Sequence, residues 1–571
     1  MSAIKSYRQV AQRCETRYDR PCCPLCTCLA GYKPLHNELL ASTNCKSNVQ
    51  QSVNMGELEK TVTGQNSIDV DVGLHESLEK RFSYWSTLGA AFSFMATPLS
   101  IGSYLVFSLS AGGSPYFFYG VVLAFFMNTL TALSLCEIAA VFPHTSGTSA
   151  KTCSYVHYAD FDQGQIFWTS SLAPPSASRA LGYACGAATM TAWVTWTAGT
   201  WLFAANILAA FIELCGSAWR PTTWQILLLY FAFALFAVGW NTVAFKWMPA
   251  LCKGMIFWIN GGSLLILVAL LVRAQPKQSA AAVFVDTVNY TGWTSDGVVF
   301  FLALLPGITA TVGFDAASHL TDEMPNPARQ VPLVMLGTIL LCGFAGIPMT
   351  IVFLFCNVRP DNLLAPIGGQ PIMQLFVDAM DSYGLSVASS VVYVGVFTFA
   401  SATILTTASR CWWSFAVCDA FPAGTWQGKV GRRFQVPTNS IAVVTGLCIV
   451  IGLLELGPTT VLTSVVATAA ICFYLSYSLP IACMLFGGRK TLTNPRFFNL
   501  GKAGVVINII SLCWSAVTSV FLCFPTVISG LTLLSMSYTS VVVVVAAVVF
   551  GLNWIFYARK AYSNPVPLYS A

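Results

Sequence analysis

Long apolar stretches recur along the chain from Ser83 onward, and short polar segments separate them. A helix that crosses the hydrocarbon core of a bilayer needs about 20 mostly apolar residues. An open sheet leaves backbone groups unpaired in lipid, so each such stretch is predicted to be helical. Twelve spans are predicted, at 83–107, 115–141, 180–213, 223–243, 248–272, 297–321, 332–356, 385–409, 438–455, 459–485, 504–526 and 534–557.

The polar segments at the two ends are predicted to be tails outside the membrane. Residues 1–82 contain no long apolar run and no apolar segment of the secretory type, so they are interpreted as a mostly disordered tail. Residues 558–571 form the second tail. The first holds a group of cysteines for which reduced thiols are favoured, and palmitoylation or metal binding remain alternatives. These are Cys14, Cys22, Cys23, Cys26 and Cys28.

Composition narrows the class of protein. Of the 571 residues, 56% are hydrophobic and only 9% are charged, whereas soluble domains carry about 25% charged residues. A chain so poor in charge cannot cover a water-facing surface. A disordered chain needs low hydrophobicity and high charge, which this chain lacks. The chain is therefore predicted to be an all-α polytopic membrane protein. Its net charge of +6 is assigned to cytoplasmic loops rather than to a nucleic-acid partner.

The distribution of basic residues predicts the orientation. With a cytoplasmic N-terminus, 25 of the 29 Lys and Arg residues fall on the inside and four on the outside, as the positive-inside rule requires. Both termini are thus predicted to be cytoplasmic. The sequon at Asn289 lies in the predicted outer loop between spans five and six, and its glycosylation is expected.

Two of the predicted spans carry helix breakers near the middle of the membrane. Span one contains Pro98 and Gly102, and span six contains Pro306, Gly307 and Gly313. Proline removes a helix hydrogen bond and clashes with the preceding turn. Spans one and six correspond if the core consists of two inverted repeats of five spans, and matched interruptions of this kind indicate a transporter binding site. Ordinary kinked helices are the alternative.

A few polar side chains within the spans are candidates for coupling or gating. Asp315 follows the span-six interruption, and ionisable groups inside a membrane are costly and usually functional. Glu137 lies near the inner end of span two, where a loop-anchoring role is favoured. Lys253 lies early in span five, where snorkelling toward the interface is favoured. For Trp193 and Trp196 in span three, packing or lipid contact is favoured over a pocket.

Several segments resemble one transporter superfamily. The span-six sequence Gly313–Glu323, followed by Asn326–Pro327, resembles the amino acid–polyamine–organocation (APC) superfamily, and is most similar to the fungal amino acid/choline permeases. The exit from span two at Cys136–Pro143 and the loop segment Trp168–Pro175 show the same resemblance, as does Arg433–Pro437. The similarity extends from about Phe82 to the C-terminus.

The resemblance implies a fold and a site. The fold is a twelve-helix transporter domain over 83–557, with inverted repeats at 83–272 and 297–485, discontinuous helices one and six, and two extra spans at 504–557. The substrate is expected between spans one and six. Amides of span one would face the carboxylate of a substrate that has one, carbonyls of span six would face the substrate's amino or ammonium group, and Phe314 would cover that group. The implied residues are Thr97, Pro98, Leu99, Ser100, Ile101, Gly102, Ala310, Thr311, Val312, Gly313 and Phe314.

This chain departs from the family pattern at three points. The span-one interruption is poorer in glycine and polar residues than is usual in the family. The segment Val417–Asp419 lacks the family's arginine, so a cytoplasmic gate charge is expected to be missing. An extra stretch at about 148–163, which is a true insertion, a retained intron or an error in the gene model, is expected in the inner loop after span two.

The function expected from these features is proton-driven secondary transport of amino acids or related amines such as GABA or choline. The plasma membrane is favoured over the vacuole. A nutrient receptor on the same scaffold, without net flux, is the alternative. An enzyme is not expected, because no His-Glu-x-x-His or phosphate-binding Gly-x4-Gly-Lys motif occurs. No cofactor, metal or nucleic-acid partner is expected.

Overall fold

The computed structural model describes residues 80–142, 164–216, 219–431, 433–457, 461–487, 489, 492, 497–532 and 536–563. The predicted N-terminal tail up to residue 79, with its cysteine group, lies outside these residues. The extra stretch at 148–163 and residues 564–571 of the C-terminal tail lie outside them as well.

The described chain is helical, as predicted, and only two isolated β-bridges occur in it. Within the described chain, eleven segments are long and apolar enough to cross a membrane. They are α8 (Gly113–Ala139), α10 (Ser178–Leu214), α11 (Thr223–Asn241), η3 with α12 (Phe245–Arg273), α14 through η4 (Asp296–His319), α16 (Pro327–Phe355), α18 (Tyr383–Val417), α20 with η8 (Thr438–Leu456), α21 (Leu462–Phe486), α22 (Ala503–Phe521) and α23 through α24 (Thr539–Ala561).

The first predicted span, 83–107, is divided into short pieces. It begins as α5 (Tyr84–Met95), continues as α6 (Thr97–Ser100) and η1 (Ile101–Tyr104), and is followed by α7 (Phe107–Ser110). Ser83 starts α5 with a capping box to Ser86, which satisfies amides at the helix start. No single piece is as long as a bilayer is thick, so the twelve-span count and the inverted repeats stay predictions.

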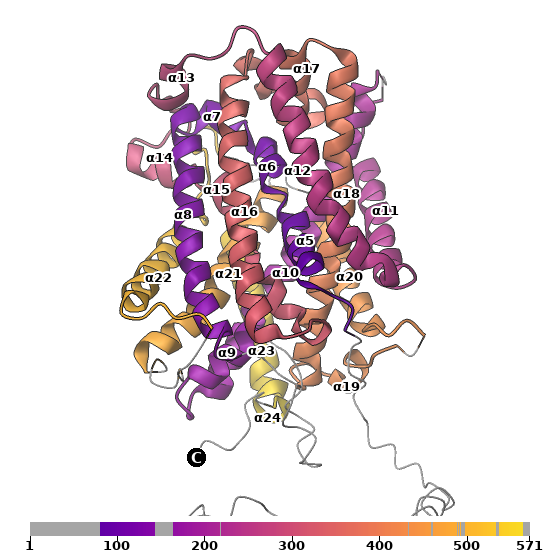
Figure 1. The fold of residues 1–571 in the computed structure, drawn as a ribbon, viewed down its shortest axis with the longest axis vertical. Coiled ribbons are helices and arrows are strands. Elements are labelled where there is room, and N and C mark those ends of the chain that lie inside the picture. Colours follow the sequence, from indigo (N-terminus) through magenta and orange to yellow (C-terminus); the bar gives the residue numbers. More distant parts are fainter. Residues whose placement is uncertain are drawn as a thin grey trace, which may run out of the picture. The chain divides into compact units, whose positions relative to one another are not determined.

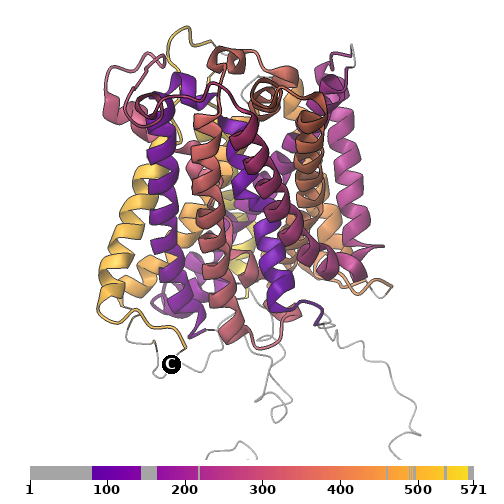
Figure 2. The same ribbon diagram turned by 45° about the horizontal axis from the view of Figure 1, so that its top comes forward.

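Figures 1 and 2 show long helices running side by side, with α13 (Ala280–Phe284) and α17 (Pro371–Met380) at one end of the bundle and α24 at the other. These ends are called the α17 end and the α24 end below. The 37-residue helix α10 packs against both α18 and α21. Helix α23 exposes most of its side chains, which are almost all apolar, as expected of a lipid-facing helix.

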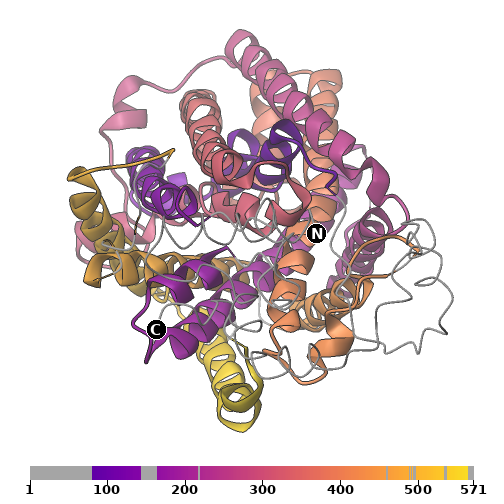
Figure 3. The same ribbon diagram turned by 60° about the horizontal axis from the view of Figure 1, so that its bottom comes forward.

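Two helices extend beyond the predicted bounds of their spans. Helix α18 runs to Val417, eight residues past the predicted end, and α16 starts at Pro327, directly after Asn326. The short helix α9 (Gln165–Leu172) was not predicted. It packs against α10 and α21 at the α24 end, the end that faces the viewer in Figure 3.

Glycines let the broken helices approach their neighbours. A Cβ atom at Gly89 of α5 would lie 2.0 Å from the Cys252 carbonyl oxygen of α12. A Cβ atom at Gly307, in the sixth predicted span, would lie 2.8 Å from the Val121 Cα atom of α8. Both distances are too short for any side chain, so these glycines fix the positions of the interrupted spans.

Candidate functional site

The first span breaks at Ala96. This residue has a left-handed backbone with φ of 42°, which is costly for any residue with a side chain. Its N–H donates to the Phe92 carbonyl and closes α5. Its own carbonyl accepts the N–H groups of Leu99 and Ser100, both at 2.9 Å. Pro98, which has no N–H, lies in the first turn of α6, where proline is tolerated.

The sixth span breaks after α15 (Leu305–Thr309). The N–H groups of Thr311 and Val312 both donate to the Ile308 carbonyl, at 3.0 Å each. Gly313 then has φ of 91°, in the region that favours glycine. The chain continues as the 3₁₀ helix η4 (Phe314–His319). The predicted interruption is therefore present in the structure.

The two breaks meet in the centre of the bundle. The Thr97 hydroxyl donates to the Ala310 carbonyl oxygen at 2.7 Å, and both residues are buried. A Cβ atom at Gly313 would lie 3.0 Å from the Phe94 ring. The interruptions predicted in spans one and six are thus joined by a direct hydrogen bond.

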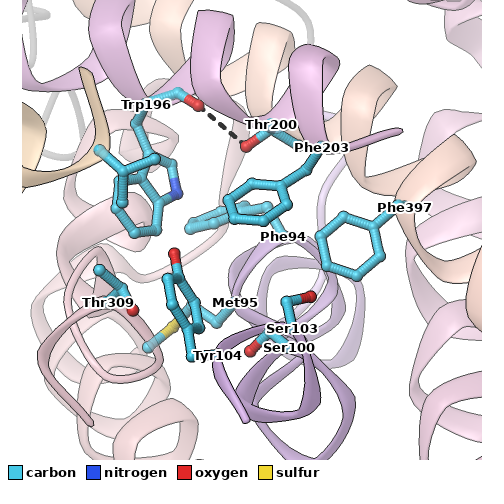
Figure 4. Close-up of a pocket in the computed structure, with 11 residues that line it drawn as sticks. Phe94, Met95, Ser100, Ser103, Tyr104, Trp196, Thr200, Phe203, Thr309 and Phe397 are labelled. Carbon is cyan, nitrogen blue, oxygen red and sulfur yellow. Dashed lines mark hydrogen bonds between the residues drawn. The ribbon is translucent and has the colours of Figure 1, made fainter. Parts of the chain in front are cut away.

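A small cavity of about 30 Å³ lies beside the breaks, with room for roughly two water molecules. Aromatic rings from α5, η1, α10 and α18 surround it, and the Ser100 and Ser103 hydroxyls lie on its α6 and η1 side (Figure 4). None of its lining side chains is charged. They are Phe94, Met95, Ser100, Ser103, Tyr104, Trp196, Thr200, Phe203, Thr309, Phe397 and Val466.

Two polar atoms at the cavity have no hydrogen-bond partner in the described part of the chain. They are the Ser100 hydroxyl oxygen and the Trp196 indole nitrogen. Trp196 is 7% exposed, and Figure 4 shows its nitrogen facing the space enclosed by the rings. Buried polar groups are normally paired, so these two atoms are candidates for contact with a ligand.

Most of the residues expected to contact substrate have other surroundings. Ser100 alone among them lines the cavity. Thr97 joins the breaks, and Gly102 packs against Ile372 of α17. Phe314 is fully buried, with its ring 5.1 Å from that of Tyr477 on α21.

Sequence reasoning missed most of the aromatic lining. Tyr104, Phe203 and Phe397 were not singled out, and Trp196 was given a packing role. The available signal was the spacing of Trp196, Thr200 and Phe203 on α10, because residues four and then three apart share one helix face.

Asp315 lies at the centre of a buried polar cluster. It is fully buried, and the amide nitrogen of Gln165 on α9 donates to its Oδ2 atom at 2.6 Å. The Tyr477 hydroxyl donates to Oδ1 at 2.5 Å, and His319 Nε2 lies 3.1 Å from Oδ2. The Gly313 N–H in turn donates to the Tyr477 hydroxyl at 3.2 Å. The cluster therefore links the span-six break to α9.

The two other coupling candidates lie in different surroundings. Glu137 accepts the Leu500 N–H and an Arg489 N–H, each at 3.2 Å. These contacts join it to the chain between α21 and α22, and both the loop-anchoring role and the coupling role of Glu137 stay predictions. Lys253 is exposed on α12, and its snorkelling toward the interface stays a prediction.

An ion pair that the sequence did not predict lies near the start of α5. Arg410 Nε donates to Glu323 Oε1 at 2.9 Å, and both side chains are 2% exposed. The Arg410 guanidinium lies 4.3 Å from the centre of the Phe245 ring, and the Glu323 carbonyl accepts the Phe82 N–H at 2.9 Å. Although Val417–Asp419 lacks the family's arginine, Arg410 places a paired charge in this region.

A second polar cluster supports the span-six break and includes Trp514, which lies outside the predicted repeats. Asn128 of α8 donates to the Thr311 hydroxyl at 2.7 Å. Its carbonyl oxygen accepts the Tyr474 hydroxyl at 2.9 Å and the Trp514 indole N–H of α22 at 3.1 Å. The Thr311 hydroxyl donates to the Gly307 carbonyl at 2.6 Å. Helix α22 therefore helps to hold the break.

Replacing Asn128 by alanine is expected to destabilise the protein by about 1.5–4.5 kcal/mol, because it removes three buried hydrogen bonds worth about 0.5–1.5 kcal/mol each. The measurement is the midpoint of thermal unfolding in detergent. Asn206→Ala is the matched control, since Asn206 bonds only the Leu202 carbonyl of its own helix, at 2.9 Å, among the contacts in the described chain. Equal midpoints for the two variants would refute the role assigned to Asn128.

Two further expectations concern the surface and metal binding. Asn289 is exposed, and its side chain accepts the Thr291 hydroxyl and donates to the Trp293 carbonyl, both at 2.7 Å. Its glycosylation stays a prediction. Within the described ranges, no group of three His, Cys, Asp or Glu side chains is placed to hold a metal ion.

A helical membrane bundle with two broken helices joined beside a buried cavity has the features of a secondary transporter. The chain belongs to the amino acid permease family, whose model matches residues 82–548, and hence to the APC superfamily. It is thus a transporter of amino acids or amines rather than an enzyme.

Several named proteins are similar over most of the chain. A choline transporter of Saccharomyces cerevisiae is 27% identical, covering 85% of this chain and 83% of that protein. A swainsonine transporter of Arthroderma benhamiae is 25% identical, covering 89% and 96%. Amino-acid permease 2 of Neurospora crassa is 23% identical, covering 89% and 90%.

Proposed function

We propose that the protein is a proton-coupled symporter that binds a small amine or amino acid, such as choline or GABA, in the aromatic-lined cavity. The observation that carries this proposal is the contact of two broken helices, joined by Thr97 and Ala310, beside a cavity with unpaired polar atoms. Aromatic faces attract ammonium groups, and a positively charged ammonium group is the feature that choline and GABA share. The names of the similar choline transporter and permease support the same substrate range.

The structure fits a closed state of an alternating-access cycle. A cavity of about 30 Å³ is too small for such a solute, so side chains around it must move. Rings of Tyr104, Phe203 and Phe397 contact one another in sequence, with centroids 5.8 and 5.9 Å apart. We assign these rings to the gate toward the α17 end and the Arg410–Glu323 pair to the gate toward the α24 end. The α24 end is the cytoplasmic one in this proposal, and the plasma membrane is the favoured location.

The coupling site that we assign is Asp315. A carboxylate buried without a permanent cation is costly unless it is protonated or hydrogen-bonded. Its partners come from α21, from η4 and from α9, and Tyr477 of α21 also accepts the Gly313 N–H at the break. Taking up a proton therefore changes hydrogen bonds that connect the break to its neighbouring helices. The experiment is uptake by purified protein in liposomes with an inward proton gradient on or off, using GABA, choline, neutral and basic amino acids and a polyamine. Binding without accumulation would favour the receptor alternative.

Thr97→Val is expected to lower uptake up to about tenfold without loss of folded protein. The change keeps the side-chain shape but removes the hydrogen bond between the two breaks, which is worth about 0.5–1.5 kcal/mol. Initial uptake rates and the yield of monodisperse protein are the measurements. Thr195→Val is the matched control, because the Thr195 hydroxyl bonds carbonyls of its own helix, at 2.6 and 3.2 Å. Wild-type uptake by Thr97→Val would argue against a site at the breaks.

A further inference from the structure

Helix α23 (Thr539–Asn553) is fixed to the bundle at its two ends. At the first end, the Tyr538 N–H donates to the Ser464 hydroxyl of α21 at 3.1 Å. At the second end, the Tyr183 hydroxyl of α10 donates to the Phe550 carbonyl at 3.1 Å, and the Asn553 side chain donates to the Tyr183 hydroxyl at 2.7 Å. Of the 15 residues of this helix, only the first is buried. The middle of α23 is therefore not packed into the bundle, at whose edge the helix lies (Figure 3).

An apolar groove of about 350 Å³ runs between α23 and helices α10 and α21. No side chain that lines it is charged, and its two hydroxyl groups, those of Tyr183 and Thr191, already donate to backbone carbonyls. The exposed residues Ala184 and Ala547 lie on its α10 and α23 walls. All three helices belong to segments that are long and apolar enough to cross a membrane, so the molecules beside the groove are lipids. A hydrocarbon chain fills such a space without burying a polar group.

Aromatic rings mark the end of the groove nearer to α24. Tyr183, Phe550 and Trp554 line it there, and the ring centres of Tyr183 and Trp554 are 4.8 Å apart. Trp and Tyr are enriched at the boundary between the hydrocarbon and the headgroups of a bilayer. The groove thus runs from this boundary into the hydrocarbon core.

A basic side chain lies directly beyond these rings. Arg179 is four residues before Tyr183 on α10, and residues four apart share a helix face. Its Nη2 atom donates to the Ala558 carbonyl at 3.4 Å, which places it between α10 and the end of α23. Its Nε atom is buried and has no hydrogen-bond partner in the described part of the chain. Arg179 therefore has a donor left for a ligand.

Two further basic residues give this end of the groove a net positive charge. Arg559 and Lys560 follow Ala558 directly and are exposed. Asp419 supplies one negative charge, close to Tyr557. Among these groups, counted with Arg179, three positive charges stand against one. Guanidinium groups bind phosphate oxygens through paired, charge-assisted hydrogen bonds.

We propose that the groove binds an anionic phospholipid, with an acyl chain between α10, α21 and α23 and the headgroup phosphate at Arg179, Arg559 and Lys560. Anionic lipids give the cytoplasmic leaflet its negative surface potential, and the α24 end faces that leaflet in the proposed orientation. The lipid fills the space behind α23 and joins this helix to α10 and α21, which carry Trp196 and Tyr477. The proposal does not depend on which solute is transported.

The test measures lipid binding to the purified full chain in detergent, by native mass spectrometry and by the midpoint of thermal unfolding. The probes are ergosterol and two phospholipids with the same chains but different headgroup charge, dioleoyl phosphatidylserine and dioleoyl phosphatidylcholine. Phosphatidylserine is expected to bind at least about tenfold more tightly than phosphatidylcholine, because each basic residue near the headgroup adds to the attraction. It should also raise the midpoint more at equal concentration.

Two results would overturn the proposal. One is equal binding of the two phospholipids, and the other is displacement of phosphatidylserine by ergosterol. Neither measurement involves uptake, so the outcome is separate from that of the transport experiments.

Ala547→Phe tests the groove, because the introduced ring occupies the space of the acyl chain. The variant is expected to lose phosphatidylserine binding, whereas Val548→Phe should keep it. Val548 is the matched control, since it is the next residue of α23, is 52% exposed and does not line the groove. Wild-type binding by folded Ala547→Phe would refute the position of the acyl chain.

Arg559→Gln combined with Lys560→Gln tests the headgroup position. This variant is expected to bind both phospholipids equally, because two charges near the phosphate are removed. Lys429→Gln combined with Lys502→Gln is the matched control, since both lysines are exposed and lie in other segments of the chain. An undiminished preference for phosphatidylserine after the loss of Arg559 and Lys560 would contradict the headgroup assignment.

Discussion

Replacing Asp315 by asparagine is expected to abolish accumulation driven by a proton gradient and to leave exchange of substrate across the membrane. Asparagine has nearly the same shape but cannot take up a proton. Exchange requires only that loaded carriers change conformation, whereas accumulation requires a proton to move with the substrate. The two activities should therefore separate in this variant.

The partners of Asp315 explain why the effect should be large. The carboxylate is fully buried and accepts hydrogen bonds from Gln165 and Tyr477, with His319 at 3.1 Å. Gln165 is the first residue of α9, and Tyr477 also holds the Gly313 N–H at the break. Protonation replaces an acceptor by a donor and so changes contacts to both elements. A neutral amide fixes one arrangement and removes the dependence on protons.

The measurements are gradient-driven uptake and counterflow in the same liposomes. Asp296→Asn is the matched control, because Asp296 is an exposed acid in the first turn of α14 (Asp296–Leu302). The control should keep both activities. Gradient-dependent accumulation by Asp315→Asn at the wild-type rate would remove Asp315 from the coupling step. Loss of exchange together with accumulation would assign it to substrate binding or gating instead.

Hydropathy and helix breakers were sufficient to predict most of the fold. The apolar stretches located eleven of the spans, since the length of a bilayer-crossing helix is set by the membrane. Pro98 and Gly313 marked interruptions that the structure contains, because a proline or a left-handed glycine changes the backbone locally. Such local rules do not depend on the rest of the chain.

The contacts between the breaks could not be predicted in the same way. The pairing of Thr97 with Ala310 spans 213 positions, and that of Trp514 with Asn128 spans 386. Such pairs depend on how all the helices pack, and a single sequence carries no direct signal of it. The Arg410–Glu323 pair was missed for the same reason, because its two residues lie 87 positions apart.

Replacing Arg410 by alanine is expected to cost about 3–5 kcal/mol of folding stability, because it leaves the Glu323 carboxylate buried without its partner. The Arg410 N–H groups also bond the Ser409 hydroxyl at 3.1 Å, and the guanidinium covers the Phe245 ring. The expected results are a strong fall in the thermal unfolding midpoint and faster amide hydrogen exchange at Phe82 and in η5 (Thr321–Glu323), where Glu323 holds the start of α5.

Arg359→Ala is the control that separates the effect of burial from the loss of an ion pair. Arg359 lies 3.7 Å from Asp378 with 70% of its side chain exposed, and exposed pairs contribute about 0–1 kcal/mol. Arg410→Met combined with Glu323→Gln should recover part of the stability, because it removes both buried charges while keeping much of the volume. If recovered stability comes with faster exchange at Phe82, the pair acts as a latch that closes the α24 end. If the double variant is stable and exchanges as slowly as wild type, the pair is not the latch, and the packing of Phe82 on Phe245, with ring centres 6.3 Å apart, must close that end.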